Sequence, residues 1–449
     1  KTYTENAFAS FYANGSYTLM NRYTLGASVR MDGSDLFGVD KKYRFLPIYS
    51  VSGLYRISNE PFFKPATGWM DNLSLRLSYG LQGNIDKNTS PYLIGTYGTQ
   101  TILPNNTENS ISISSAPNDK LRWEKTASYN IGVDFSILNG RLGGTIEYYD
   151  KRTKDLIYDY PVSTNRYPYG SMTANVGEIS NKGIELTINA IPVQTKNFQW
   201  STTLNLSHNQ NKVVKLSNST YSVNYIDQGN PNVGGFVGVN TQRIMEGEPI
   251  GTFYMWEWAG YNENGISIFN EYDENGELTG TTENPQDKDR RKVGHAQPKL
   301  NLGWNNTLNY KNWTLTAFFQ GVFGNKILNS TRAQFNNVTN LRVGKNGLRE
   351  IINGQKATDT NAHAPSDRYL ENGSYLRLSS LSLGYNFGKI GNWINNLKLT
   401  ATCNNVFTIT SYEGRDPEIN LGGLAPGIDS RETYYPRTRT FMLGLNVNF

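Results

Sequence analysis

The chain has 449 residues, of which 37% are hydrophobic and 18% are charged, and its formal net charge is +5. No stretch approaches the roughly 20 consecutive apolar residues of a membrane-spanning helix, and the small, scattered basic excess argues against nucleic acid as a partner. The abundance of glycine (43 residues) and tyrosine (29 residues) indicates an all-β protein.

Alternating strands are predicted along the whole chain. The first begins near Asn6 and no apolar signal region precedes it, so either a precursor was processed or the chain is part of a longer polypeptide. Period-two alternation then marks strands that have one apolar and one polar face. Clear examples are residues 73–81, 184–190, 397–403 and 441–449.

Short and long connections take turns between these strands. Short ones lie near Asn21, at Asn139 and Gly140, near Thr195, at Lys311 and Asn312, and around Gly391. Long polar ones cover residues 33–45, 83–126, 153–176, 210–299, 324–374 and 410–438. Such alternation of short periplasmic turns and long extracellular loops is typical of outer-membrane proteins. The pattern predicts a transmembrane antiparallel β-barrel, and a soluble all-β fold is the alternative.

Strand directions predict that this barrel is incomplete. If Phe449 lies at the periplasmic edge, the connections give about thirteen strands, and the first and the last run in the same direction. Neighbouring strands of such a barrel are antiparallel, so these two cannot pair. We therefore expect an odd number of further strands upstream. Residues 210–299 contain the strand-like piece "PIGTFYMWEWAGY", but parity forbids a single crossing there, so we interpret them as a long folded extracellular loop.

Thiol, metal and acid-base chemistry are not predicted. Cys403 is the single cysteine, and His208, His295 and His363 lie far apart in the sequence, so no cofactor, no metal site and no Ser-His-Asp arrangement is expected. Asp416 and Glu418 could be imagined as a glycosidase pair, but they fall in a loop. Cys403 falls on the apolar side of its strand and is predicted to face lipid.

Six segments, in this order, resemble the SusC/RagA family of TonB-dependent outer-membrane transporters. They cover the chain from about Leu121 to its end. They read "LRWEKTASYNIGVDFSILNGRLGGTIEYYDKRTKDLI", "NVGEISNKGIEL", "GEPIG", "YKNWTLTAFFQGVFGN", "NGSYLRLSSLSLGYNF" and "NNVFTITSYEGRDPEIN".

The resemblance implies a bacterial outer-membrane barrel of about 22 strands with a plugged lumen. It implies import of oligosaccharides or peptides, a SusD-like surface lipoprotein as partner, and TonB acting through an N-terminal region. Nothing in residues 1–449 resembles a plug or a TonB box, so this chain is expected to be the C-terminal part of the barrel. A terminal aromatic strand is the barrel-assembly signal in such proteins, and Phe441, Leu443, Leu445, Val447 and Phe449 match it.

One segment departs from the family. The family often carries an Asp-rich "DxNGDG" segment, of which Asp273, Asn275 and Gly276 retain little. A calcium loop needs several carboxylates at alternate positions, so a plain turn is expected there.

Substrate contacts are predicted at aromatic side chains in the long connections, because flat rings stack on sugars. Loop packing or an interfacial girdle is the alternative use of any one of them. The candidates are Tyr158, Tyr160, Tyr167, Tyr169, Trp256, Trp258, Tyr434 and Tyr435.

Charges on polar strand faces, namely Arg76, Asp134, Glu147 and Glu185, are expected to line water or contact a plug. The sequence thus favours the barrel of an oligosaccharide transporter. The alternatives are peptide import, a secreted all-β carbohydrate-binding module and an adhesive surface barrel.

Overall fold

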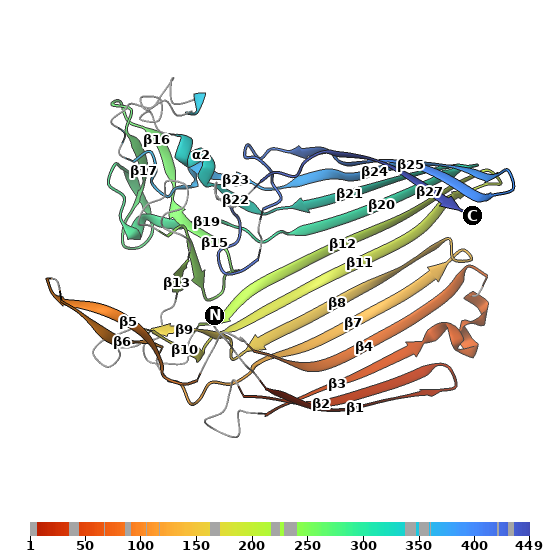
Figure 1. Cartoon of the computed structure of the whole chain (residues 1–449), viewed down its shortest axis with the longest axis horizontal. Helices are drawn as coiled ribbons and strands as arrows, with labels where there is room; N and C mark the ends of the chain where they lie inside the picture. The colour runs from red at the N-terminus through yellow and green to blue at the C-terminus, as the bar shows by residue number, and fades with distance from the viewer. Residues whose placement is uncertain are drawn as a thin grey trace. The chain divides into compact units, whose positions relative to one another are not determined.

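The computed structural model is dominated by long strands and is shown in Figure 1. It describes residues 7–35, 45–66, 68–85, 91–104, 106–115, 117–161, 171–216, 225–228, 240–336, 347–349, 359, 361–419, 422–429 and 435–449. Among these residues no helix is long and apolar enough to cross a membrane.

A thirteen-stranded sheet runs through the described part of the chain, which confirms the predicted strand number. Its order is β1-β2-β3-β4-β7-β8-β11-β12-β20-β21-β24-β25-β27, so β1 and β27 stand at its two ends and do not pair with each other. The strands are β1 Phe8–Leu19, β2 Tyr23–Ser34, β3 Phe45–Arg56, β4 Met70–Asn84, β7 Glu124–Ile137, β8 Leu142–Lys154, β11 Glu178–Gln194, β12 Phe198–Lys215, β20 Leu300–Tyr310, β21 Trp313–Phe323, β24 Tyr375–Ile390, β25 Ile394–Thr410 and β27 Thr440–Asn448.

The short connections are tight hairpin turns at the predicted places. Asn139 and Gly140 both have positive φ, 55° and 76°, and Arg141 N–H donates to the Leu138 carbonyl at 3.3 Å. Two central residues with positive φ define the hairpin turn whose twist matches that of the strands. A turn of the same kind joins β1 to β2, whereas the 3₁₀ helices η1 (Ile57–Asn59) and η2 (Pro61–Ala66) lie between β3 and β4.

The long connections fold into small sheets of their own. No strand between β12 and β20 joins the thirteen-stranded sheet within the described residues, and the piece around Trp256 forms two short strands instead. The small strands are β5 Ile94–Leu103, β6 Asn106–Ser115, β9 Ile157–Pro161, β10 Ser171–Asn175, β13 Tyr225–Gln228, β14 Gln242–Met245, β15 Thr252–Trp256, β16 Trp258–Tyr261, β17 Ser267–Tyr272, β18 Leu278–Thr282, β19 Arg290–His295, β22 Lys326–Asn329, β23 Leu370–Asn372 and β26 Ile428–Asp429.

The chain divides into two compact units. The first holds Lys1–Ser136, Ile146–Gly183 and Val213–Val223, and the second holds Ile137–Thr145, Ile184–Lys212 and Asn224–Phe449. In the first unit, β5 pairs with β6 and β9 with β10, and Leu46, Leu121 and Trp123 form a small core.

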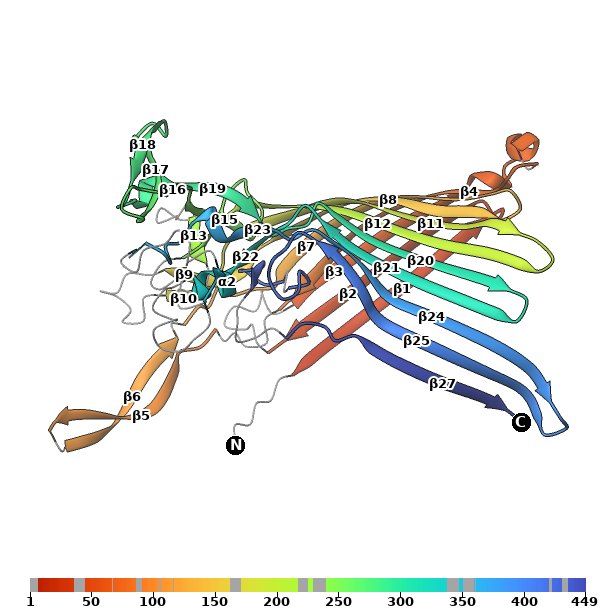
Figure 2. The same ribbon diagram turned by 90° about the horizontal axis from the view of Figure 1, so that it is seen from above.

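In the second unit, β12, β20, β21, β24, β25 and β27 are successive antiparallel neighbours, and Figure 2 shows the last three of them side by side. Pairing aligns residues of like polarity, because directly opposed residues point to the same face. Cys403 pairs with Leu381 and with Phe441, and Leu399 pairs with Leu445.

The resulting apolar face is open to its surroundings. Phe441, Leu443 and Leu445 are 76%, 82% and 64% exposed, and Phe449 is 85% exposed. A contiguous exposed apolar face of this kind marks a surface made for an apolar environment. Leu315, Leu381, Cys403 and Leu443 border one shallow hollow on it, which places Cys403 among apolar neighbours.

Candidate functional site

The long connections of the second unit share one hydrophobic core. We call these segments the loop cap: the described residues within 240–299, 325–336, 359–373 and 411–429. Its helical turns are η3 (Asp287–Asp289), α2 (Ser330–Phe335) and η4 (Asp367–Tyr369). The core consists of Phe253, Met255, Ala296, Leu328, Ala333 and Tyr369, each at most 1% exposed. These six residues come from two connections, and Ile428 of a third connection packs against them, so three separate connections form one folded body.

Two glycines allow the segments of this core to approach closely. Gly251 and Gly427 have φ of +84° and +77°, where other residues are strained. A Cβ at Gly251 would lie 2.5 Å from Pro426, and a Cβ at Gly427 would lie 2.4 Å from Ala296. The "GEPIG" segment thus ends in a glycine that the packing requires.

The two tryptophans proposed from sequence lie in the loop cap and pack against it. The Trp256 indole donates to the Gln286 carbonyl at 2.8 Å, and its ring lies 5.9 Å from that of Phe269. The Trp258 ring is covered by the Arg368 guanidinium at 4.7 Å and meets the Tyr261 ring edge-on at 5.5 Å. The Trp256 ring therefore packs within its own connection, whereas the Trp258 ring contacts a second connection through Arg368.

Two half-buried histidines make the loop cap sensitive to acid. Desolvation lowers the pKa of both His295 and His363. Their stabilising contribution is complete above the unfolded pKa of about 6.5 and is lost as pH falls through the lower folded value. Burial instead raises the pKa of Asp367, so its contribution is present below about pH 3.9 and is lost as pH rises.

We therefore expect the loop cap to open more readily at about pH 5 than at about pH 7, by at most about 1.4 kcal/mol per pH unit for each histidine. Hydrogen exchange of residues 252–256, corrected for its intrinsic pH dependence, measures this opening. Asp367→Asn serves as the background, because it removes the opposing titration. In that background His363→Gln should reduce the pH dependence, and an unchanged slope would exclude His363 as a source.

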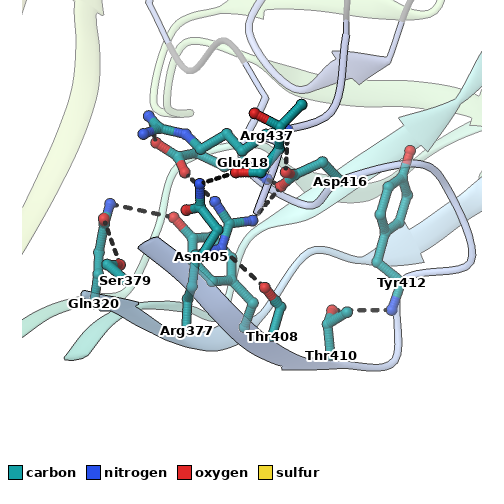
Figure 3. Close-up of polar contacts among 12 residues, drawn as sticks. Gln320, Arg377, Ser379, Asn405, Thr408, Thr410, Tyr412, Asp416, Glu418 and Arg437 are labelled. Carbon is teal, nitrogen blue, oxygen red and sulfur yellow. Dashed lines mark hydrogen bonds and ion pairs between the residues drawn. The ribbon is translucent and has the colours of Figure 1, made fainter. Parts of the chain in front are cut away.

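A buried ion cluster fixes the segment that follows β25 (Figure 3). Arg377 on β24 donates to Thr408 at 2.9 Å, to Glu418 at 2.6 Å and also to Asp416. Arg437 pairs with the other oxygen of Glu418. The side chains of Arg377 and Asp416 are 3% and 6% exposed. The two carboxylates are thus held by arginines, which is a structural use and not an acid-base pair.

The polar face of the first unit carries a second ion cluster. Arg76 donates to Asp134 at 2.7 Å and also reaches Glu147 at 2.5 Å. Lys182 pairs with Asp150 at 2.9 Å, so these charges compensate one another. Four charges were singled out in the sequence. Arg76, Asp134 and Glu147 pair together, whereas Glu185 makes no ion pair within the described residues.

The structure describes three of the six remaining predicted contact residues. Tyr158 and Tyr160 lie on β9 in the first unit and are partly buried, and Tyr435 lies in the second unit with 80% exposure. Tyr167, Tyr169 and Tyr434 lie outside the described residues. Substrate contact by any of the eight aromatic residues stays a prediction.

Asp273 closes a hairpin turn. Its carboxylate accepts the backbone N–H groups of Asn275 and Glu277 at 2.9 and 2.8 Å, and these bonds lower its pKa. Asn262 makes the same turn between β16 and β17. No metal-binding group of His, Cys, Asp and Glu occurs in the described part of the chain.

The antiparallel sheet, its exposed apolar face and its large folded connections define the wall of a β-barrel. Residues 1–406 match the family model for the TonB dependent receptor-like β-barrel, and the chain belongs to this family.

Curated relatives agree with this family. The chain is 31% identical to TonB-dependent receptor P3 of Formosa agariphila over 99% of its own length and 46% of that protein. It is 30% identical to TonB-dependent receptor SusC of Bacteroides thetaiotaomicron, over 99% of the chain and 44% of SusC. The resemblance found in the sequence segments is thereby confirmed, and the chain spans about half the length of the curated relatives it matches.

A solved structure shares the fold. The structure described as the RagAB peptide transporter superposes with a TM-score of 0.80 at 24% identity, over 99% of this chain and 48% of that one. At this identity the likeness concerns the fold.

Proposed function

We propose that this chain is the C-terminal part of an outer-membrane, TonB-dependent transporter that imports oligosaccharides. Family membership carries the proposal, together with a thirteen-stranded sheet whose one face is apolar and exposed. A barrel needs an apolar outer face and a polar interior. These features suit transport better than catalysis. Asp416 and Glu418, the two carboxylates considered as an acid-base pair, are both bound to Arg377.

The proposal extends to parts beyond this chain. Neighbouring strands are antiparallel. The two end strands of the sheet, β1 and β27, do not pair with each other. A plug, a TonB box and the further barrel strands would be supplied by an N-terminal region. A SusD-like surface lipoprotein would cover the long connections, including residues 210–299, on the extracellular side. Phe441, Leu443, Leu445, Val447 and Phe449 would form the assembly signal.

Peptide import is the second candidate function. The observation that favours it is the fold shared with the RagAB structure, which is described as a peptide transporter. The exposed apolar face weighs against the secreted carbohydrate-binding module, because a soluble protein rarely leaves such a face uncovered.

Uptake measured in the bacterium that encodes the chain tests the function. We expect that deleting the coding region abolishes uptake of labelled neutral oligosaccharides from plant and microbial glycan hydrolysates. A labelled casein digest is the parallel substrate, and loss of its uptake alone would favour peptide import. An affinity-tagged receptor should require detergent for extraction and should co-purify with a lipoprotein. Recovery of the tagged protein from the medium without detergent would contradict the outer-membrane assignment.

A further inference from the structure

The polar face of the second unit contains a hollow whose lining makes no ion pair within the described residues. It has a volume of ≈400 Å³ and lies over β11, β12, β20 and β21. Its polar lining consists of Glu185, Thr187, Asn205, Ser207, Asn301 and Gln320, and Gly303 also lines it. Asn205 pairs with Gly303, and Gly303 pairs with Gln320, so these positions form one row across three strands.

The lining is rich in neutral groups that both donate and accept hydrogen bonds. Thr187 donates to the amide oxygen of Asn205 at 2.9 Å, and within the described residues the Asn205 amide N–H groups have no acceptor. Among the described residues, the Gln320 side chain makes two long contacts: it donates to the Tyr375 hydroxyl at 3.4 Å and accepts from the Ser379 hydroxyl at 3.5 Å. Amide groups with unused capacity suit hydroxyl groups, which also donate and accept.

Glu185 is the single charge of the lining, and its side chain is exposed. Within the described residues it has no arginine or lysine partner, unlike Asp134 and Glu147 in the first unit. A carboxylate only accepts hydrogen bonds, so it favours ligands that present donors and repels anions. The hollow therefore suits a neutral ligand with many hydroxyl groups.

An aromatic ring lies at the edge of the hollow. Phe318 pairs with Asn305 on the same face and is 36% exposed. A Cβ built on Gly303 would lie 3.8 Å from the ring of Phe318 and 3.9 Å from the Cβ of Asn205. The glycine thus leaves open the space between the ring and the amide.

The direction of this ring follows the regular alternation of β21, whose pairing with β20 has no register shift. The pairing of β21 with β24 shifts register between Phe318 and Phe319. The extra residue at this shift is Ser379 on β24, and bulges of this kind are common beside functional sites. Phe319 stacks on Trp304, with ring centroids 5.3 Å apart, on the apolar side, whereas Phe318 is left among amide groups.

We propose that this hollow is a binding subsite for neutral oligosaccharides. Phe318 offers the flat apolar face on which a sugar ring stacks, Gly303 provides the space, and Asn205, Gln320 and Glu185 bind the hydroxyl groups. The inference rests on the proposed transport function, and it names the substrate class and the residues that recognise it.

Filling the hollow tests the subsite. Gly303 lies outside the left-handed region, and a Cβ there meets only ordinary contacts, so Gly303→Leu is tolerated by the strand and blocks the space. Gly444→Leu is the matched control, because Gly444 lies on β27 away from the hollow and its Cβ would meet only the Thr400 carbonyl at 3.9 Å. Native mass spectrometry of the detergent-purified receptor measures the capture of three probes: a neutral maltodextrin and inulin hydrolysate, an oligogalacturonate pool and a casein digest.

We expect Gly303→Leu to reduce capture of the neutral hydrolysate roughly tenfold, while Gly444→Leu retains it. Phe318→Ala should also reduce capture, and Phe318→Trp should restore it. Unchanged capture by Gly303→Leu overturns the subsite, and a Gly303-dependent capture of galacturonates or peptides overturns the ligand class. Uptake of oligosaccharides by cells carrying the wild-type receptor tests the transport function separately. If uptake occurs while either of these outcomes is found, the subsite proposal fails and the transport function stands.

Discussion

Replacing Arg377 with methionine should loosen the segment after β25, at a cost of about 3 kcal/mol in the free energy of its opening. The side chains of Arg377 and its partner Asp416 are 3% and 6% exposed, so the variant leaves a buried carboxylate without its arginine partner. The cost falls at the lower end of the range for broken buried pairs, because Asp416 also accepts the backbone N–H of Glu418 at 2.9 Å. Hydrogen exchange of residues 411–419 measures the effect, and protection should fall roughly a hundredfold.

Two further variants isolate the charge effect. Arg437→Met removes a pair whose arginine is 55% exposed, so it should cost less than about 1 kcal/mol. Combining Arg377→Met with Asp416→Asn and Glu418→Gln should recover most of the protection, because neutral side chains cost less to bury than unpaired charges. Equal exchange in the single and the triple variant would show that packing of Arg377, and not its charge, holds the segment.

The strands could be predicted because alternation is a local signal. The row Phe441, Leu443 and Leu445 is already visible in the sequence, and it pairs with Cys403, Ala401 and Leu399 as one apolar face. The turn at Asn139 and Gly140 was equally local, since both residues favour positive φ. Strand number and the places of the connections follow from such signals.

The loop cap could not be predicted in the same way. Phe253 meets Leu328 and Tyr369, which come from another connection more than seventy residues later, and alternation carries no information on such contacts. The ion cluster has the same character. Arg377 is one arginine in an alternating strand, and its partners Asp416 and Glu418 lie about forty residues further on. Their sequence spacing gives no sign of this pairing.

Aromatic residues were also open to two readings. A tryptophan in a long connection can stack on a sugar or pack against its own loop, and the Trp256 indole donates to Gln286 and its ring packs on Phe269 in the same connection. Phe318, by contrast, is an apolar residue at a polar position of its strand. In the sequence it looks like a break in the alternating pattern. Only the pairing with Asn305 reveals that its ring lies on the polar face.

Phe253→Ala should open the loop cap while the strands of the large sheet remain protected. The Phe253 side chain is 0% exposed and lies in a core built from three connections, and deleting a buried phenyl ring costs about 3–5 kcal/mol. The strands β20 and β21 keep their backbone pairing, since none of the core residues belongs to them. Hydrogen exchange should therefore rise in residues 252–256 and 290–295 and stay unchanged in residues 300–323.

Two controls separate packing from general destabilisation. Leu278 lies in the loop cap but is 60% exposed, so Leu278→Ala should change the free energy of opening by less than about 0.5 kcal/mol. Phe253→Leu keeps most of the volume and should cost less than about 1.5 kcal/mol. If residues 300–323 lost protection together with the cap, the two would form one cooperative unit. Access through the cap would then require unfolding of the wall, and a transporter that must open repeatedly could not use these loops as its gate.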